Sequence, residues 1–443
     1  MNEEILSLDQ YLNMFPWTES QKAAGDILEW LWHYEVKAPV DQLWPHLCDT
    51  NRFNRDLGYD GLEFVEKAGI LYGASGTDRL RWEWIEYPWD WVYGRYSIHL
   101  RTYTRGLLLH NRSGYYLQPL NEGQSTRVYG YIGSVFDNPL GRRYLKNYES
   151  RFEARFQSVF RKIEQRLLGQ PETPNVYDIR LLEMGEKTQQ QLEVMREKLV
   201  RLGFAPTLID RLMQYLFEAD QIELQRIRIK PLAKAWDVPL EDLLKLCLGA
   251  VRVGLFTISW DVICPHCRGV RLEVPTMAAI PNSVRCDACE LDFVTTGDHA
   301  VEVTFRIRPE IKEVPQAAFC SAEPNKKRHI KIQKNLPPSA QNEAIEVFLP
   351  AGNYRMRVNG FNDLSSFEVR AEGVIKGVGG SELHLATRQS GKIILNNPHA
   401  RPVIFVLEEV RWPDDALQPT EVLKQTGFED VLKGQLEPTI PVT

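Results

Sequence analysis

The sequence predicts a multidomain α+β protein, and three observations carry that prediction. A chain of 443 residues is longer than one hydrophobic core usually supports, so about three or four domains are expected. Eight of the eleven tryptophans fall within the first 91 residues, which indicates a separate domain rich in large aromatic side chains. Two Cys-x-x-Cys pairs then stand between a helical stretch and a long stretch of alternating strands.

Residues 1–169 are predicted to form the first domain. A strand at 31–36 and a short helix after Pro39 are followed by strands at 62–65, 78–86, 91–103, 115–119 and 126–135. A long helix is expected to begin at Asn138-Pro139, because apolar residues then recur every three or four positions from Leu145 to Leu167. Antiparallel strands wrapped around one long terminal helix make a helix-grip arrangement. The space between sheet and helix often forms a cavity.

Four side chains are candidates for the lining of such a cavity. Trp82 and Trp84 share one face of a strand, as do Tyr96 and Ile98, and either face could point inward. The alternative for each aromatic is a filled core. His99 and Arg101, which alternate on the second strand, are either polar groups inside the pocket or groups on the solvent face.

Residues 170–205 are expected to be a linker followed by a helix, and 206–260 a winged-helix-like helical domain with a helix-turn-helix. The expected second helix begins Pro239-Leu240-Glu241-Asp242. A helix that reads DNA normally brings Arg, Lys, Asn or Gln to the bases at that end, and two carboxylates would be repelled by phosphate. Binding to nucleic acid is therefore disfavoured, and a structural or protein-contact role is expected.

Residues 261–297 are predicted to be a zinc ribbon. Its ligands would be Cys264, Cys267, Cys286 and Cys289, with eighteen residues between the two pairs. Four thiolates satisfy the tetrahedral preference of Zn²⁺ and leave no open position for water, so the single ion is expected to be structural.

Alternating apolar residues from 298 to 412 predict an antiparallel β-sandwich, and 413–443 a short helix with a loose tail. The N-terminus has no signal-peptide pattern, and no run of about 18 apolar residues indicates a membrane span. Seven cysteines, an odd count that includes two Cys-x-x-Cys pairs, favour a reducing compartment. These features predict a cytoplasmic protein. The net charge of -6 leaves no broad basic field that would draw the protein to nucleic acid or acidic membranes.

Two segments resemble known families. The phrase EVKAPVDQLWPHLCDTNRFNRDLG resembles the opening of START-like (polyketide-cyclase, SRPBCC) helix-grip domains, a resemblance that covers roughly 20–168. The stretches IRIKPLAKAWDVPLEDLLKLCLGAVRVGLFTISWDVICPHCRG and CDACELDFVTTGDHAVEVTFRIRPEI resemble a region found upstream of bacterial class III adenylate/guanylate cyclase domains. LPAGNYRMRV, KIILNN and EEVRWPDDALQPTEVL look like the same family's sandwich and its exit toward the cyclase.

The cyclase domain itself is not in the sequence, which ends at Thr443 without the aspartates that hold Mg²⁺ in class III cyclases. The resemblance implies either a stand-alone relative or the sensory portion of a longer protein, and in both cases no cyclic nucleotide made by this chain.

The function expected is that of a non-catalytic regulatory or sensory protein that binds a hydrophobic small molecule. A protein partner or a nucleotide cyclase domain is expected as well. One alternative is an interaction scaffold with a vestigial cavity, and another is a nucleic-acid-associated protein that uses the helix-turn-helix and the ribbon. A third is an enzyme acting in the cavity, which would require perturbed titratable groups facing inward. The sequence contains no nucleophile elbow, phosphate loop or zinc-protease helix.

Overall fold

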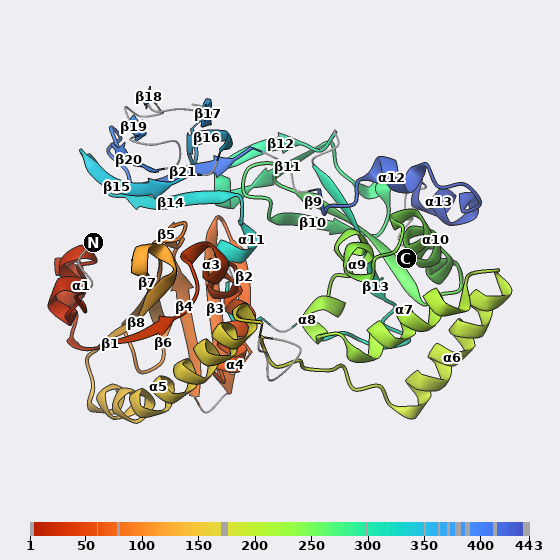
Figure 1. Cartoon of the computed structure of the whole chain (residues 1–443), viewed down its shortest axis with the longest axis horizontal. Coiled ribbons are helices and arrows are strands. Elements are labelled where there is room, and N and C mark those ends of the chain that lie inside the picture. The colour runs from red at the N-terminus through yellow and green to blue at the C-terminus, as the bar shows by residue number, and fades with distance from the viewer. Residues whose placement is uncertain are drawn as a thin grey trace. The chain divides into compact units, whose positions relative to one another are not determined.

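The chain forms two compact units (Figure 1). Each unit has its own hydrophobic core. Unit 1 comprises Met1–Asp178 and Ala318–Arg411, and unit 2 comprises Ile179–Ala317 and Trp412–Thr443. The computed structural model describes residues 4–59, 61–77, 80–169, 176–296, 300–316, 318–321, 323–349, 351–361, 364–369, 373–376, 382–385, 390–410 and 414–436.

The first part of unit 1 is an antiparallel sheet with a helix-grip topology. Its strands lie in the order β1-β8-β7-β6, and β6 continues through β4 and β3 to β2. Their bounds are β1 (Asp26–Val36), β2 (Glu63–Lys67), β3 (Ile70–Thr77), β4 (Leu80–Glu86), β6 (Tyr96–Arg105), β7 (His110–Leu120) and β8 (Ser125–Phe136). Short helices precede and follow β1: α1 (Leu8–Met14), α2 (Glu19–Ala23), α3 (Val40–Cys48) and α4 (Thr50–Asp56).

The long helix α5 (Pro139–Leu167) closes this sheet. It begins where the sequence predicts, because the Asn138 side chain accepts a hydrogen bond from the backbone N–H of Gly141, and Pro139 needs no donor in the first turn. Its apolar stripe packs into a core shared with α3, α4 and the sheet. The buried members on the helix are Phe152, Phe156, Val159, Phe160 and Ile163.

The sheet does not end at β6. The short strand β5 (Asp90–Val92) pairs with the first residues of β6 and, on its other side, with β14 (Ile330–Leu336), which lies about 240 residues later in the chain. The order β5-β14-β21-β16-β17 then extends the same sheet. The added strands are β16 (Gly352–Val358), β17 (Leu364–Val369) and β21 (Val403–Glu409), with α11 (Glu323–Lys326) before β14.

A second antiparallel sheet, in the order β15-β20-β19-β18, completes the sandwich predicted for this region. One core cluster joins residues from both sheets, including Ile345 and Ile393 from the second sheet and Met356 and Phe405 from the first. The strands of the second sheet are β15 (Glu343–Phe348), β18 (Gly373–Lys376), β19 (Glu382–Leu385) and β20 (Ser390–Leu395).

Unit 2 combines helices with a three-stranded antiparallel sheet, β10-β9-β13, and a hairpin, β11–β12. Its strands are β9 (Phe256–Ile263), β10 (Val270–Val274), β11 (Ser283–Cys286), β12 (Leu291–Val294) and β13 (Val301–Ile307). Its helices are α6 (Glu186–Arg201), α7 (Pro206–Glu218), α8 (Gln221–Leu224), α9 (Ile229–Trp236), α10 (Leu240–Arg252), α12 (Pro419–Leu423) and α13 (Glu429–Leu436). Asp237, in the left-handed region with φ 52°, makes the turn between α9 and α10.

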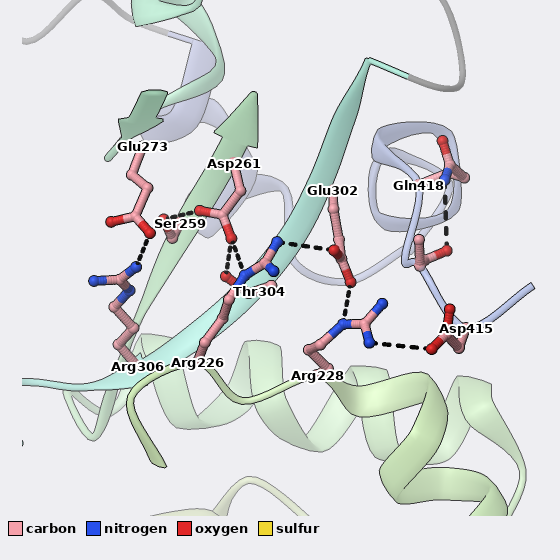
Figure 2. Close-up of polar contacts among 11 residues, drawn as sticks. Arg226, Arg228, Ser259, Asp261, Glu273, Glu302, Thr304, Arg306, Asp415 and Gln418 are labelled. Carbon is pink, nitrogen blue, oxygen red and sulfur yellow. Dashed lines mark hydrogen bonds and ion pairs between the residues drawn. The ribbon is translucent and has the colours of Figure 1, made fainter. Parts of the chain in front are cut away.

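A network of ion pairs holds the sheet of unit 2 to its flanking segments (Figure 2). Asp261 on β9 and Glu302 on β13 are both buried, and Arg226 bridges them with contacts of 2.7 and 2.8 Å. Arg228 pairs with Glu302 at 2.6 Å and with Asp415 at 3.0 Å. The network therefore ties the segment after residue 413 to β13.

The units divide the chain differently from the six predicted ranges. β13 falls in the range 298–412 predicted for the sandwich, yet it pairs along its whole length with β9. The tail predicted at 413–443 contains two helices, and Leu417, Val422 and Phe428 are buried in the core of unit 2. The predicted boundaries at 170, 297, 298 and 413 lie outside the described residues.

Candidate functional site

A cavity of about 480 Å³ lies within the helix-grip part of unit 1. Its walls come from α4, β3, β4, β6, β7, β8 and α5, together with Phe319. Large apolar side chains form much of this lining: Leu57, Trp82, Trp84, Trp89, Leu108, Ile132, Leu145 and Phe156.

The four predicted lining residues divide between the two faces of the sheet. Trp82 and Trp84 line the cavity from β4. Tyr96 and Ile98 lie on the other face of β6 and pack in the core of the sandwich. Their neighbours Ser97, His99 and Arg101 line the cavity instead.

Glu86 organises the polar side of the cavity, and nothing in the sequence analysis singled it out. It is 3% exposed and accepts hydrogen bonds from the indole nitrogens of Trp84 and Trp89 at 2.8 and 3.0 Å. The Arg101 Nε donates to it at 2.7 Å and the Ser321 hydroxyl at 3.3 Å. Burial alone would raise the pKa of Glu86, but the Arg101 guanidinium and these donors hold it below its usual value. Glu86 is therefore ionised.

His99 occupies the same face of β6 two residues before Arg101. Its ring stacks on Trp89 with centroids 4.6 Å apart, and its Nε2 lies 3.0 Å from the Ser113 hydroxyl on β7. Burial, reinforced by the positive charge of Arg101, lowers the pKa of His99 to about 4. The imidazole is therefore neutral near pH 7.

The second candidate site is the cysteine cluster of unit 2. Cys264, Cys267, Cys286 and Cys289 are each at most 2% exposed, and their sulfurs all lie within 4.8 Å of one another. Four sulfurs at about 2.3 Å from one Zn²⁺ would lie about 3.8 Å apart along each edge of a tetrahedron. The Cys267 and Cys286 sulfurs are 3.7 Å apart, so the donor set fits that ion.

Local backbone geometry brings the two pairs together. Cys264 follows β9, and Cys286 ends β11. The residue after each pair, Arg268 or Glu290, is in the left-handed region, with φ of 56° and 55°. Both pairs thus end in the same kind of tight turn, which lets two thiols of one short loop face a common centre.

The cluster has little apolar core of its own. The buried residues packed around the sulfurs are only Val262 and Phe293 among the described residues of this cluster. Hydrogen bonding to Cys267 and Cys286 raises the pKa of the Cys264 thiol, whereas hydrogen bonding with Cys264 lowers the pKa of the Cys286 thiol. A bound metal would supply the missing cohesion.

The helix that would read DNA in a helix-turn-helix is largely enclosed. Leu243, Leu244, Leu246, Cys247 and Leu248 of α10 are all buried, and α9, β9, α6 and α13 contact it. None of the helices in the described part of the chain has the length and apolar character needed to cross a bilayer.

The model of DUF5939, a family of unknown function, matches residues 185–327. No curated protein matches. Among solved structures, the Zhui aromatase/cyclase from Streptomyces sp. R1128 aligns at 14% identity over 32% of this chain and 96% of its own, with a TM-score of 0.27.

Two other solved structures align with a similar share of the chain. A conserved protein from Geobacillus kaustophilus has 18% identity over 32% of this chain and 96% of its own, with a TM-score of 0.23. Norcoclaurine synthase from Thalictrum flavum has 10% identity over 38% of this chain and 99% of its own, with a TM-score of 0.22. These TM-scores are too low to support an argument about the fold. The helix-grip assignment therefore depends on the strand order and on the packing of α5.

Proposed function

We propose that this chain is a regulatory or sensory protein whose helix-grip domain binds a hydrophobic small molecule. The cavity of about 480 Å³ carries this proposal. Ligand sites of roughly 300–1,000 Å³ with mostly apolar walls and a few polar groups are the usual pattern for small-molecule binding. Here the apolar walls converge on one buried ion pair, Glu86–Arg101, which could orient a ligand.

The proposal includes one structural zinc ion held by Cys264, Cys267, Cys286 and Cys289. Its support is the closed set of four sulfurs, which leaves no ligand position for a substrate. In the sequence, the four cysteines lie between β9 and β13, and these two strands pair with each other. The ion would therefore hold in place the segment that connects them.

A regulatory role toward a nucleotide cyclase domain is proposed on the sequence resemblance of residues 226–308. The chain alone should make no cyclic nucleotide. Joined at its C-terminal end to a class III cyclase domain, it should change the rate of cyclic nucleotide formation when the cavity is occupied. If cyclic nucleotide forms at the same rate with and without a ligand in the cavity, this part of the proposal is wrong.

An enzyme acting in the cavity is a second candidate, and one observation favours it. Glu86, His99 and Arg101 are titratable groups with shifted pKa values near the cavity. However, Glu86 already accepts four hydrogen bonds, and a neutral His99 with a lowered pKa is a weak base near pH 7. These contacts fit a binding role better than proton transfer.

The binding proposal can be tested with an uncharged fluorescent probe, N-phenyl-1-naphthylamine, titrated into the full chain. Trp82 lines the cavity and packs on Tyr103 and Tyr144, with ring centroids 5.6 and 5.2 Å apart. Trp82→Ala removes one apolar wall, so the affinity should fall at least about tenfold, given about 1.5–3 kcal/mol for a large buried side chain.

Trp236→Ala is the matched control, because Trp236 packs on Tyr215 in unit 2 and is not part of the cavity lining. It should leave the affinity unchanged. Equal affinity in both variants, or no saturable binding to the wild type, would contradict the proposal.

A further inference from the structure

We propose that the occupant of this cavity is an uncharged molecule with a planar aromatic body and at least one oxygen group that hydrogen-bonds to the hydroxyl of Ser97 or Thr50. This inference rests on the proposed binding function and narrows it to a chemical class. It depends on the balance of charge in the lining, on two buried hydroxyls and on the aromatic walls.

The charge of the lining is already balanced. Among the described residues that line the cavity, Arg101 is the only one with a formal charge, since the His99 ring is neutral near pH 7. Glu86 pairs with Arg101 at 2.7 Å, and its side chain is 1% exposed. A carboxylate or an ammonium on the ligand would lose its hydration without gaining a free counter-charge, which is costly in a buried site. An uncharged ligand avoids that cost.

Two hydroxyls in the lining have no hydrogen-bond partner among the residues that the structure describes. The Thr50 side chain on α4 and the Ser97 side chain on β6 both line the cavity, and the residues are 4% and 7% exposed. A buried hydroxyl without a partner is costly, and buried polar groups in proteins are almost always satisfied. Ser97 shares its strand face with His99 and Arg101, so donors and acceptors line up along β6. An oxygen of the ligand would complete this row.

The walls fit a flat ring system. Trp82 and Trp84 stand side by side on β4, and Tyr103 on β6 contacts both, with ring centroids 5.6 and 5.9 Å away. The Arg101 guanidinium lies 4.8 Å from the centre of the Trp84 ring, so it presents a planar surface there too. Flat aromatic surfaces are best covered by another flat ring, because stacked and edge-to-face contacts then extend over its whole area.

Three probes that share one ring system separate these requirements. Pyrene, 1-hydroxypyrene and 1-pyrenecarboxylate are titrated into the full wild-type chain at pH 7 and followed by fluorescence. The hydroxyl should strengthen binding about threefold to tenfold over pyrene, as one neutral hydrogen bond does. The carboxylate should bind at least about tenfold more weakly than 1-hydroxypyrene. Equal affinities for the three probes, or tightest binding of the carboxylate, would overturn the inference while leaving the binding function intact.

Variants locate the hydrogen bond. Ser97→Ala and Thr50→Val each remove a hydroxyl for which the described part of the chain offers no partner, so neither should lower the thermal stability. At least one of them should abolish the preference for 1-hydroxypyrene over pyrene without weakening pyrene itself. Ser125→Ala changes a buried serine of β8 that bonds to Asn121 outside the cavity and should leave the preference unchanged.

The failures are distinguishable. A preference for 1-hydroxypyrene that survives in both cavity variants would show that water or the ion pair, not these hydroxyls, satisfies the ligand, and the inference would be wrong. Failure of all three probes to bind would instead count against the proposed binding function.

Discussion

Substitution of Glu86 by Gln should destabilise unit 1 more than any surface charge change. The carboxylate accepts four hydrogen bonds, two on each oxygen: Trp84 and Arg101 on Oε2, and Trp89 and Ser321 on Oε1. A glutamine has one oxygen, so its NH₂ group must face either the Trp84–Arg101 donors or the Trp89–Ser321 donors. At the same time Arg101, 11% exposed at its side chain, loses its counter-ion.

The expected loss of stability in Glu86→Gln follows from this geometry. Removing one partner of a buried ion pair costs about 3–5 kcal/mol, because the other charge stays buried. For a unit of this size, 1 kcal/mol corresponds to about 2–4 °C, so the melting temperature should fall by on the order of 10 °C. Arg101→Met should cost a similar amount. The double variant should be about 2 kcal/mol more stable than the sum of the two single changes predicts, since it removes both charges together.

Tryptophan fluorescence during urea unfolding of the full chain is the appropriate assay. Eight of the eleven tryptophans lie in unit 1, so the signal reports mainly on the domain that contains Glu86. Glu63→Gln is the matched control, because Glu63 pairs with Arg81 at the exposed strand β2 of the same sheet, and it should leave the transition in place. A Glu86→Gln transition no different from that of Glu63→Gln would refute the reasoning.

Two further predictions concern the metal and the pH. Cys286→Ser should abolish the binding of one equivalent of zinc and increase amide hydrogen exchange in β11 and β12. Cys247→Ser, which changes a buried cysteine of α10, should keep the metal. Metal analysis that finds zinc in both variants would contradict the site. His99 has a lowered pKa of about 4, so the unfolded chain binds a proton that the folded chain does not between pH 6.5 and 4. Stability should therefore fall as the pH drops through that window, by at most about 3–4 kcal/mol from His99. His99→Gln should flatten the dependence of stability on pH, measured by urea unfolding at each pH. An unchanged dependence would show that His99 titrates normally.

Local patterns in the sequence identified much of the fold. The apolar stripe and the Asn138-Pro139 start predict α5 within a residue, because both are properties of the helix itself. The cysteine spacing likewise predicts a cluster that the structure brings together, since each pair needs only a tight turn. Pairings between distant segments were not predictable in this way. β5 pairs with β14, and β9 with β13, across intervening segments that carry no signal of these contacts.

The cavity lining shows the same limit. Alternation along β6 predicts two faces, but both faces are covered, one by the cavity and one by the sandwich core. Periodicity therefore could not decide between Tyr96 and Ile98 on one side and Ser97 and His99 on the other. Glu86 was missed because a charged residue at the end of a strand usually faces solvent. Its position two residues after Trp84, on the same strand face, was the available signal.

Native mass spectrometry of the full chain, purified without added ligand and compared with its denatured mass, tests the central claim most directly. The account predicts a mass excess of one zinc ion plus one small organic molecule, and loss of the organic part in Trp82→Ala. A native mass with zinc alone, together with no saturable binding of N-phenyl-1-naphthylamine, would contradict a ligand-binding cavity.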